Sequence, residues 1–219
     1  MTAIAAATRA SRNTHSRLIL ATERLIARHG VEGVSMRQIG QAAGMGNNSG
    51  VQYHFGTKER LIEAVLAYRQ PFLDARRREL LEQVQARGAP STRDILEILL
   101  RPLTELVDED GEHVYAQFIW QLRRADLLGE LPIHLQTLSE RDDELPRLLM
   151  QALGHPALPA MGLVIRSAFA MFLFMLISRD KQSGASGGFD LEVALQLGVD
   201  MVEAALAAAT RAVAAGKAR

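Results

Sequence analysis

Residues 40–61 read GQAAGMGNNSGVQYHFGTKERL, and this stretch decides the fold of the chain. It places glycines, asparagines, aromatic residues and a histidine between two segments with the apolar spacing of helices. Asparagine, serine and glycine are unfavourable inside a helix. A short helix built from them is therefore expected to serve recognition rather than packing.

The rest of the chain predicts an all-α protein. Apolar periodicity is helical almost throughout, and no run of alternating β-branched residues predicts a strand. One long helix is expected to begin after Thr57, its N-cap, and to be kinked at Pro71. The expected helices are 14–29, 36–43, 48–54, 58–87, 92–107, 112–128, 133–153, 160–179 and 190–214.

The first three of these helices have the layout of a helix-turn-helix. Ser35 with Gln38 three residues later predicts a capping box at the start of the second helix, and Gly44 is expected to end it. In this motif the third helix enters the major groove of DNA. Val51 and Phe55, four residues apart, are expected to anchor that helix on the core.

The candidate DNA-contacting residues are polar or basic and lie at the exposed ends of the second, third and fourth helices. Asparagine can hydrogen-bond adenine edges, and helix N-termini suit phosphate oxygens. Asn47 and Asn48 could instead be turn and N-cap residues only, and Tyr53 and His54 could be half buried. The full set is Ser35, Arg37, Asn47, Asn48, Ser49, Gln52, Tyr53, His54, Thr57 and Lys58.

Taken together, LILATERLIARHGVEGVSMRQIGQAAG, YHF and TKERLIEAVL resemble the N-terminal domain of the TetR family of transcriptional regulators, over residues 14–66. The link before the third helix is one residue longer than usual, and Gln-Tyr-His-Phe stands at 52–55 where the family has Tyr-His-Tyr-Phe. The resemblance assigns phosphate contact to Lys58. It also implies a homodimeric repressor that binds a palindromic operator in double-stranded DNA and is released by a small effector.

The resemblance and the pattern together predict three segments: a flexible arm at 1–13, a helix-turn-helix DNA-binding domain at 14–66, and a helical ligand-binding and dimerisation domain at 67–219. Charge is distributed accordingly. Residues 1–70 hold nine Lys or Arg and four Asp or Glu, a net charge of +5, whereas the remainder carries −5. A basic segment on an acidic body favours contact with a polyanion, although an excess of this size can also arise by chance.

The last helix predicts the dimer interface. Its small and apolar residues recur every three or four positions, so that two subunits could form a four-helix bundle; burial of the same stripe inside one monomer is the alternative. The interface candidates are Leu191, Leu195, Gly198, Val202, Ala205 and Ala209. A largely apolar effector suits aromatic and methionine side chains of the middle helices, and the pocket candidates are Tyr115, Phe118, Trp120, Met171, Phe174 and Met175.

Other classes of function find little support. The chain has no cysteine, no nucleophile motif and no phosphate-binding glycine loop, so we predict no enzyme, no cofactor and no metal site. The acidic run 108–113 is expected to be a solvated turn. The apolar run 163–177 contains Arg166 and is too short for a membrane span, and a cytoplasmic location is expected. The alternatives are a helical protein-interaction module and a non-specific DNA-binding protein without an effector.

Overall fold

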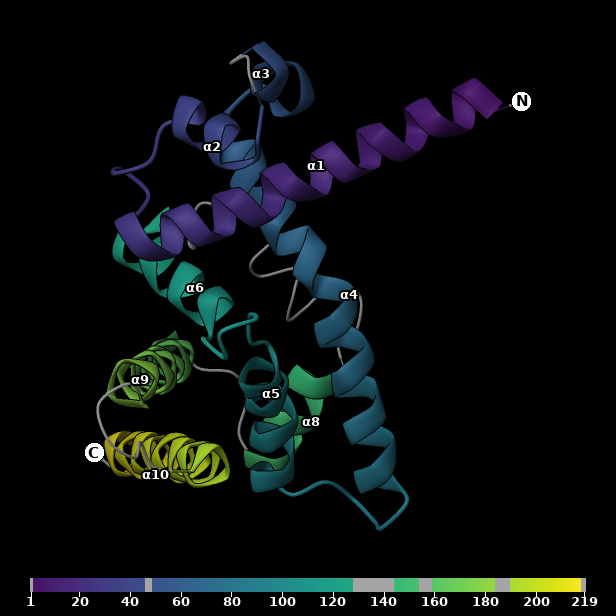
Figure 1. Ribbon diagram of the computed structural model, residues 1–219. Helices are drawn as coiled ribbons and strands as arrows, with labels where there is room; N and C mark the ends of the chain where they lie inside the picture. Colours follow the sequence, from purple (N-terminus) through teal and green to yellow (C-terminus); the bar gives the residue numbers. More distant parts are fainter. Residues whose placement is uncertain (1, 46–48, 128–143, 154–158, 184–189, 218–219) are drawn as a thin grey trace. The chain divides into compact units, whose positions relative to one another are not determined.

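The computed structural model describes residues 2–45, 49–127, 144–153, 159–183 and 190–217. These residues form helices joined by turns, with no strand among them, which confirms the predicted all-α class (Figure 1). The helices are α1 (Thr2–His29), α2 (Met36–Ala42), α3 (Ser49–Phe55), α4 (Lys58–Gln85), α5 (Thr92–Glu105), α6 (Val114–Arg124), α8 (Glu144–Leu153), α9 (Pro159–Ser183) and α10 (Leu191–Lys217).

Two helix starts differ from the prediction. α1 begins at Thr2 instead of residue 14, and alanine, the strongest helix former, fills five of positions 3–10. α6 begins at Val114 because the acidic run before it closes on itself: Asp108 Oδ1 accepts the backbone N–H groups of Asp110 and Glu112 at 3.0 and 2.9 Å. The expected helix 133–153 is described only from Glu144, and its earlier part lies outside the described residues.

The chain divides into two compact units. The head unit comprises Met1–Pro71 and Gln117–His134, and the body unit comprises Phe72–Ala116 and Leu135–Arg219. The division falls inside α4, directly after Pro71. The DNA-reading elements predicted from the sequence therefore belong to the head, and the predicted dimer interface belongs to the body.

An ion pair inside the head joins α1 to α4. Glu23 is 1% exposed, and Arg69 donates to both of its carboxylate oxygens, from Nε at 3.0 Å and from Nη2 at 2.7 Å. In this bidentate geometry both carboxylate oxygens of Glu23 accept a hydrogen bond from the guanidinium of Arg69. The negative charge of Glu23 can therefore be buried. The core of the head also contains fully buried apolar side chains, among them Leu18, Ile26, Ile39, Val51, Leu61, Ile62 and Val65.

In the body, α10 packs against α9 and α5. The crossing of α9 and α10 is close because residue 198 is glycine: a Cβ there would come within 2.3 Å of Phe172 Cδ2. Leu195, Gly198 and Val202 are consequently buried within one chain. For these three the alternative, burial inside one monomer, describes the single chain, and their place in a dimer interface stays a prediction. Leu191, Ala205 and Ala209 are half-buried and stay predictions.

By length and composition, α10 between Leu191 and Ala212 is apolar enough to cross a membrane. Its inward residues Leu195, Val199 and Leu206 are nevertheless buried inside the body. Its polar side carries Asp200, which pairs with Arg93 of α5. Because α10 contacts its own chain through both its apolar side and Asp200, it is a core helix of the body.

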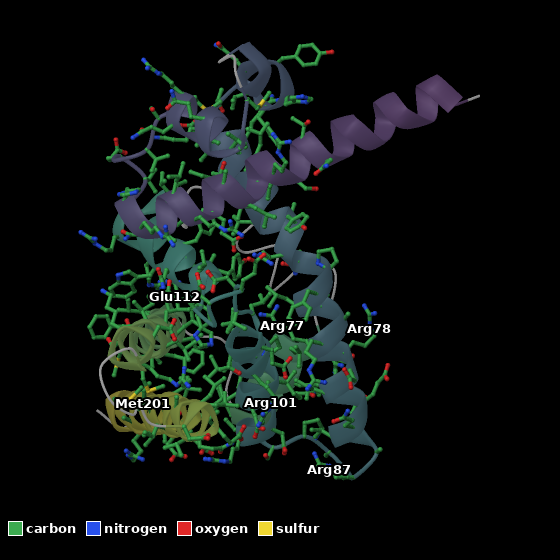
Figure 2. The ribbon with its side chains drawn as sticks, viewed as in Figure 1. Arg77, Arg78, Arg87, Arg101, Glu112 and Met201 are labelled. Atoms are coloured by element: carbon green, nitrogen blue, oxygen red, sulfur yellow. The ribbon has the colours of Figure 1, made fainter. Side chains whose placement is uncertain are left out.

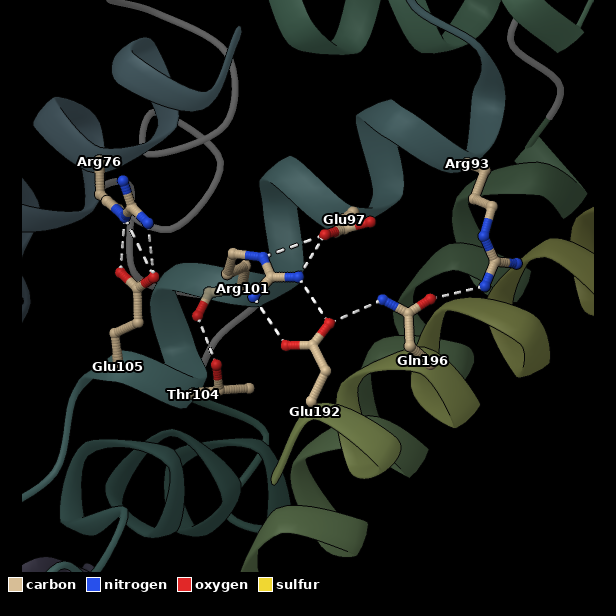
Figure 3. A network of polar contacts seen from close by, with 8 residues as sticks. All are labelled: Arg76, Arg93, Glu97, Arg101, Thr104, Glu105, Glu192 and Gln196. Carbon is tan, nitrogen blue, oxygen red and sulfur yellow. Dashed lines mark hydrogen bonds and ion pairs between the residues drawn. The ribbon is translucent and has the colours of Figure 1, made fainter. Parts of the chain in front are cut away.

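A polar network joins α5 to α10 and to α4 (Figure 3). Arg101 donates from Nη1 to Glu192 at 2.9 Å and also binds Glu97 one turn earlier on its own helix. Arg93 donates to Gln196 at 2.7 Å. Arg76 of α4 forms a fork with Glu105, and these hydrogen bonds raise the pKa of its guanidinium. Each pair is partly exposed and contributes little alone, whereas the linked set fixes the register of three helices.

His113 fastens the end of α5 to α9. The ring is fully buried, with Nδ1 2.8 Å from Asp180 Oδ1 and Nε2 3.1 Å from the Thr104 carbonyl oxygen. The backbone N–H of His113 donates to Asp180 Oδ2 at 2.8 Å. His113 thus connects the carbonyl end of α5 with the Asp180 carboxyl group of α9.

Gly198→Ala should destabilise the body. Alanine favours a helix by about 1 kcal/mol over glycine, but the new methyl group overlaps the Phe172 ring, and overpacking of this kind costs about 1–3 kcal/mol. We expect a lower denaturation midpoint in urea, and partial recovery in Gly198→Ala with Phe172→Leu. A Gly198→Ala protein more stable than the parent would contradict this account of the crossing.

Candidate nucleic-acid interface

The start of α2 is fixed by a capping box. Ser35 Oγ accepts the backbone N–H of Gln38 at 3.3 Å, and Gln38 Oε1 accepts the backbone N–H of Ser35 at 2.8 Å. This confirms the predicted box and satisfies two amide groups that the first turn of a helix leaves without partners. Both side chains remain exposed, as does Arg37, so the first turn of α2 presents polar groups to solvent.

α2 and α3 approach each other at a glycine. A Cβ on Gly40 would lie 2.7 Å from Val51 Cγ2, a distance that side chains do not tolerate. The turn between the helices begins with Gly44 at φ +70°, a left-handed conformation that favours glycine. Gly40 therefore sets how near α3 lies to α2, and Gly44 sets where α2 ends.

α1 holds the other side of this motif. Arg17 donates from Nε to the Ala43 carbonyl oxygen at 2.8 Å and so satisfies the C-terminal end of α2. The His15 ring packs on Phe55 of α3, with ring centroids 4.4 Å apart. Burial and the nearby His54 lower the pKa of His15, which favours a neutral imidazole against the phenyl ring. Sequence spacing alone revealed neither contact, because each joins residues at least 26 positions apart.

α3 has one buried side and one exposed side. Val51 and Phe55 are buried, as predicted, and anchor the helix. Gln52 is exposed and Tyr53 is 87% exposed, an unusual position for a large ring. An open hollow of about 580 Å³ beside the helix is lined by these two residues and by His54 and Arg60, among others. Asn47 and Asn48 lie outside the described residues, and Ser49 is the first residue of α3.

α4 begins beside this surface. Thr57 Oγ1 accepts the backbone N–H of Arg60 at 3.3 Å, which confirms Thr57 as the predicted cap. Lys58 Nζ donates to the Val31 and Val34 carbonyl oxygens, at 2.9 and 3.2 Å, in the turn between α1 and α2. An ammonium group has three donors. Lys58 thus anchors that turn with two of these donors.

The sequence of this region matches a known family. Residues 18–65 fit the model described as bacterial regulatory proteins, tetR family. These residues therefore resemble the amino-terminal domain of TetR-family regulators. The matched residues run from α1 to the first part of α4 and thus cover the whole of the helix-turn-helix.

Solved structures of TetR-family proteins are similar in fold. A protein from Rhodococcus sp. assigned to the TetR family of transcriptional regulators is 17% identical, with a TM-score of 0.52 over 89% of this chain and 99% of that one. The TetR-family regulator PfmR from Thermus thermophilus is 19% identical, with a TM-score of 0.49 over 85% and 96%. No curated protein matches the sequence. At 17% identity the first likeness supports the fold of this chain and nothing finer.

The predicted effector-pocket residues do not share one environment. Tyr115 and Phe118 are buried in the cores, and Trp120 and Met175 are half-buried. Met171 and Phe174 are 54% and 56% exposed on α9. The single chain leaves these two side chains on the exterior of α9, and the effector-pocket set stays a prediction.

Gly40→Ala should loosen the helix-turn-helix of this chain. The new methyl group overlaps Val51, whose branched side chain has little rotamer freedom, so we expect a loss of about 1–3 kcal/mol. Gln41→Ala, at an exposed position of the same helix, is the matched control. Unfolding in urea measures the loss, and Val51→Ala in the Gly40→Ala background should restore part of it. Equal stability of Gly40→Ala and Gln41→Ala would refute the close approach.

Proposed function

We propose that this TetR-family regulator is a cytoplasmic homodimeric repressor that acts by binding and not by catalysis. In this proposal α3 reads the major groove of a palindromic operator, and a small-molecule effector releases it. The supporting observation is the two-sided α3: Val51 and Phe55 fix the helix, while Gln52 and Tyr53 point their polar groups outward.

The contacts with DNA are proposed to divide into two kinds. Gln52, Asn47, Asn48 and Ser49 lie on or before α3 and are suited to base edges, because amide and hydroxyl groups match the donor and acceptor pattern of the major groove. The flanking groups face the phosphates. They are Ser35, Arg37, Tyr53, His54, Thr57 and Lys58.

A second subunit is proposed to cover apolar residues that the single chain leaves exposed. Leu163, Met171 and Phe174 recur at helical spacing on α9 and are each more than half exposed. On α10, Val193 and Leu197 are 49% and 45% exposed. Exposed apolar side chains at helical spacing on two packed helices suit a four-helix bundle with a copy of the chain. Two heads would then read half-sites about 34–36 Å apart, and an effector would act by changing that separation.

Selection of bound sequences from a random DNA duplex pool tests the proposal. We expect the full-length protein to enrich an inverted repeat, because a two-fold dimer presents the same reading helix twice. Leu197→Glu should weaken dimer formation in analytical ultracentrifugation and lower the affinity for the repeat. Val107→Glu, an exposed apolar position elsewhere in the body, is the matched control.

The outcomes of that selection separate the alternatives. Salt-sensitive binding without enrichment would favour a non-specific DNA-binding protein. The absence of any binding would favour a helical interaction module. A single enriched half-site, together with a monomer in the centrifuge, would keep the DNA-binding role and reject the dimer.

Lys58→Met should lower the affinity for all DNA sequences alike. Loss of one phosphate contact reduces the slope of log K against log salt by about 0.9. Removal of two hydrogen bonds to the α1–α2 turn should also lower the melting temperature slightly. Affinity measured at several salt concentrations tests the phosphate role, with Arg78→Met of the body as the control. An unchanged salt slope with a lowered melting temperature would make Lys58 purely structural.

A further inference from the structure

The C-terminal end of α2 leads directly into the turn before α3. Inside the head, α1 packs against α2, and α2 packs against α3 (Figure 2). Two backbone hydrogen bonds close the end of α2: the Met45 N–H donates to the Gly40 carbonyl oxygen at 2.9 Å, and the Gly44 N–H donates to the Gln41 carbonyl oxygen at 3.0 Å. Together with the left-handed conformation of Gly44, they form a Schellman motif. The last four carbonyl groups of a helix lack partners inside it, and this motif satisfies two of them.

Arg17 of α1 binds the carbonyl group at which α2 ends. Its Nε donates to the Ala43 carbonyl oxygen at 2.8 Å, and its Nη2 donates to the same oxygen. Ala43 is the C-cap of α2. The guanidinium comes close to the turn, because a Cβ on Gly44 would lie 3.1 Å from Arg17 Nη2. Glycine at position 44 therefore permits both the left-handed backbone and the approach of the arginine.

Different contacts hold different parts of α3. Its middle contacts α2 where Val51 meets Gly40. Its C-terminal end contacts α1 where Phe55 meets His15. Its N-terminal end follows the turn whose first carbonyl group Arg17 binds. In a helix-turn-helix, the N-terminal end of the recognition helix contacts the base edges. Arg17 therefore acts on the end of α3 at which a DNA sequence would be read.

We propose that Arg17 is a positioning residue that determines how well the protein distinguishes its operator from other DNA. The guanidinium is planar and rigid, so two donors that converge on one oxygen fix its direction as well as its distance. Base contacts need such placement, because a hydrogen bond weakens steeply as its angle falls. Phosphate contacts carry no sequence information directly. The effect of Arg17 on operator choice rests on the proposed DNA-binding function, whereas its hold on the turn does not.

Hydrogen–deuterium exchange tests the hold on the turn without DNA. Arg17→Met removes a charged hydrogen-bond donor, so we expect peptides that cover residues 40–55 of the full-length protein to exchange at least about tenfold faster. Arg24→Met is the matched control, because Arg24 is exposed about two turns further along α1 and carries the same charge. Exchange at the parent rate in Arg17→Met would show that Arg17 does not hold the turn and would overturn the proposal.

Binding to two duplexes tests the effect on operator choice. One duplex carries the inverted repeat enriched from the random pool, and the other carries the same bases with both half-sites scrambled. We expect Arg17→Met to reduce the ratio of the two affinities about tenfold, which is the size of one lost base contact. Arg24→Met should keep the ratio of the parent. A merely structural loss of folded protein would weaken binding to both duplexes by the same factor and leave the ratio unchanged.

Arg17→Lys and the salt dependence separate positioning from direct contact with DNA. Lysine keeps the charge and can donate to the Ala43 oxygen without the planar fork, so we expect it to recover part of the affinity ratio. The slope of log K against log salt should stay at the parent value in Arg17→Met. A slope reduced by about 0.9 with an unchanged ratio would make Arg17 a phosphate contact and overturn the positioning role.

Two further outcomes separate this proposal from the proposed function. An unchanged affinity ratio despite faster exchange of residues 40–55 would reject the role of Arg17 in operator choice and leave DNA binding in place. If the parent protein itself enriches no repeat, the proposed function fails, and the role of Arg17 in operator choice fails with it.

Discussion

The close approach of Gly40 to Val51 is the constraint on which DNA reading by this chain depends. A helix of seven residues cannot hold itself together, because nucleation alone costs more than so few hydrogen bonds return. α3 is therefore stable only as a part of the surface that α1 and α2 make for it. Gly40 permits the contact with Val51, His15 packs on Phe55, and Arg17 satisfies the end of α2. The contacts of Val51 and Phe55 lie on the buried side of α3, and Gln52 and Tyr53 remain exposed to solvent.

The body applies the same principle at another glycine, with a different consequence. At Gly198, α10 lies so close to Phe172 that Leu195, Gly198 and Val202 are buried inside the chain. The apolar residues that remain exposed, Leu197 and Val193 among them, lie beside that stripe rather than on it. A helix with apolar residues around most of its circumference can serve an internal and an external contact at once, and the composition of α10 follows from this double use.

The sequence predicted features that depend on residues close together in one helix. It did not predict features that depend on contacts between distant segments of the chain. The capping box of Ser35 and Gln38, the cap at Thr57 and the anchors Val51 and Phe55 depend on spacings of three or four residues, which a helix fixes without help. Which of two apolar stripes on α10 faces inward depends instead on α9 and α5, and periodicity carries no information about them. The Arg17 and Lys58 contacts join distant residues through carbonyl groups, which no side-chain pattern can reveal.

The charges of this chain show where its structure is complete and where it is open. Glu23 is buried and receives a bidentate arginine, and His113 is buried and receives Asp180, so both sites are closed within the protein. Lys58 spends two of its three donors on carbonyl groups. The proposed phosphate contact would use the third donor at the first turn of α4, so that this site, unlike those of Glu23 and His113, would be completed by DNA and not by the chain itself.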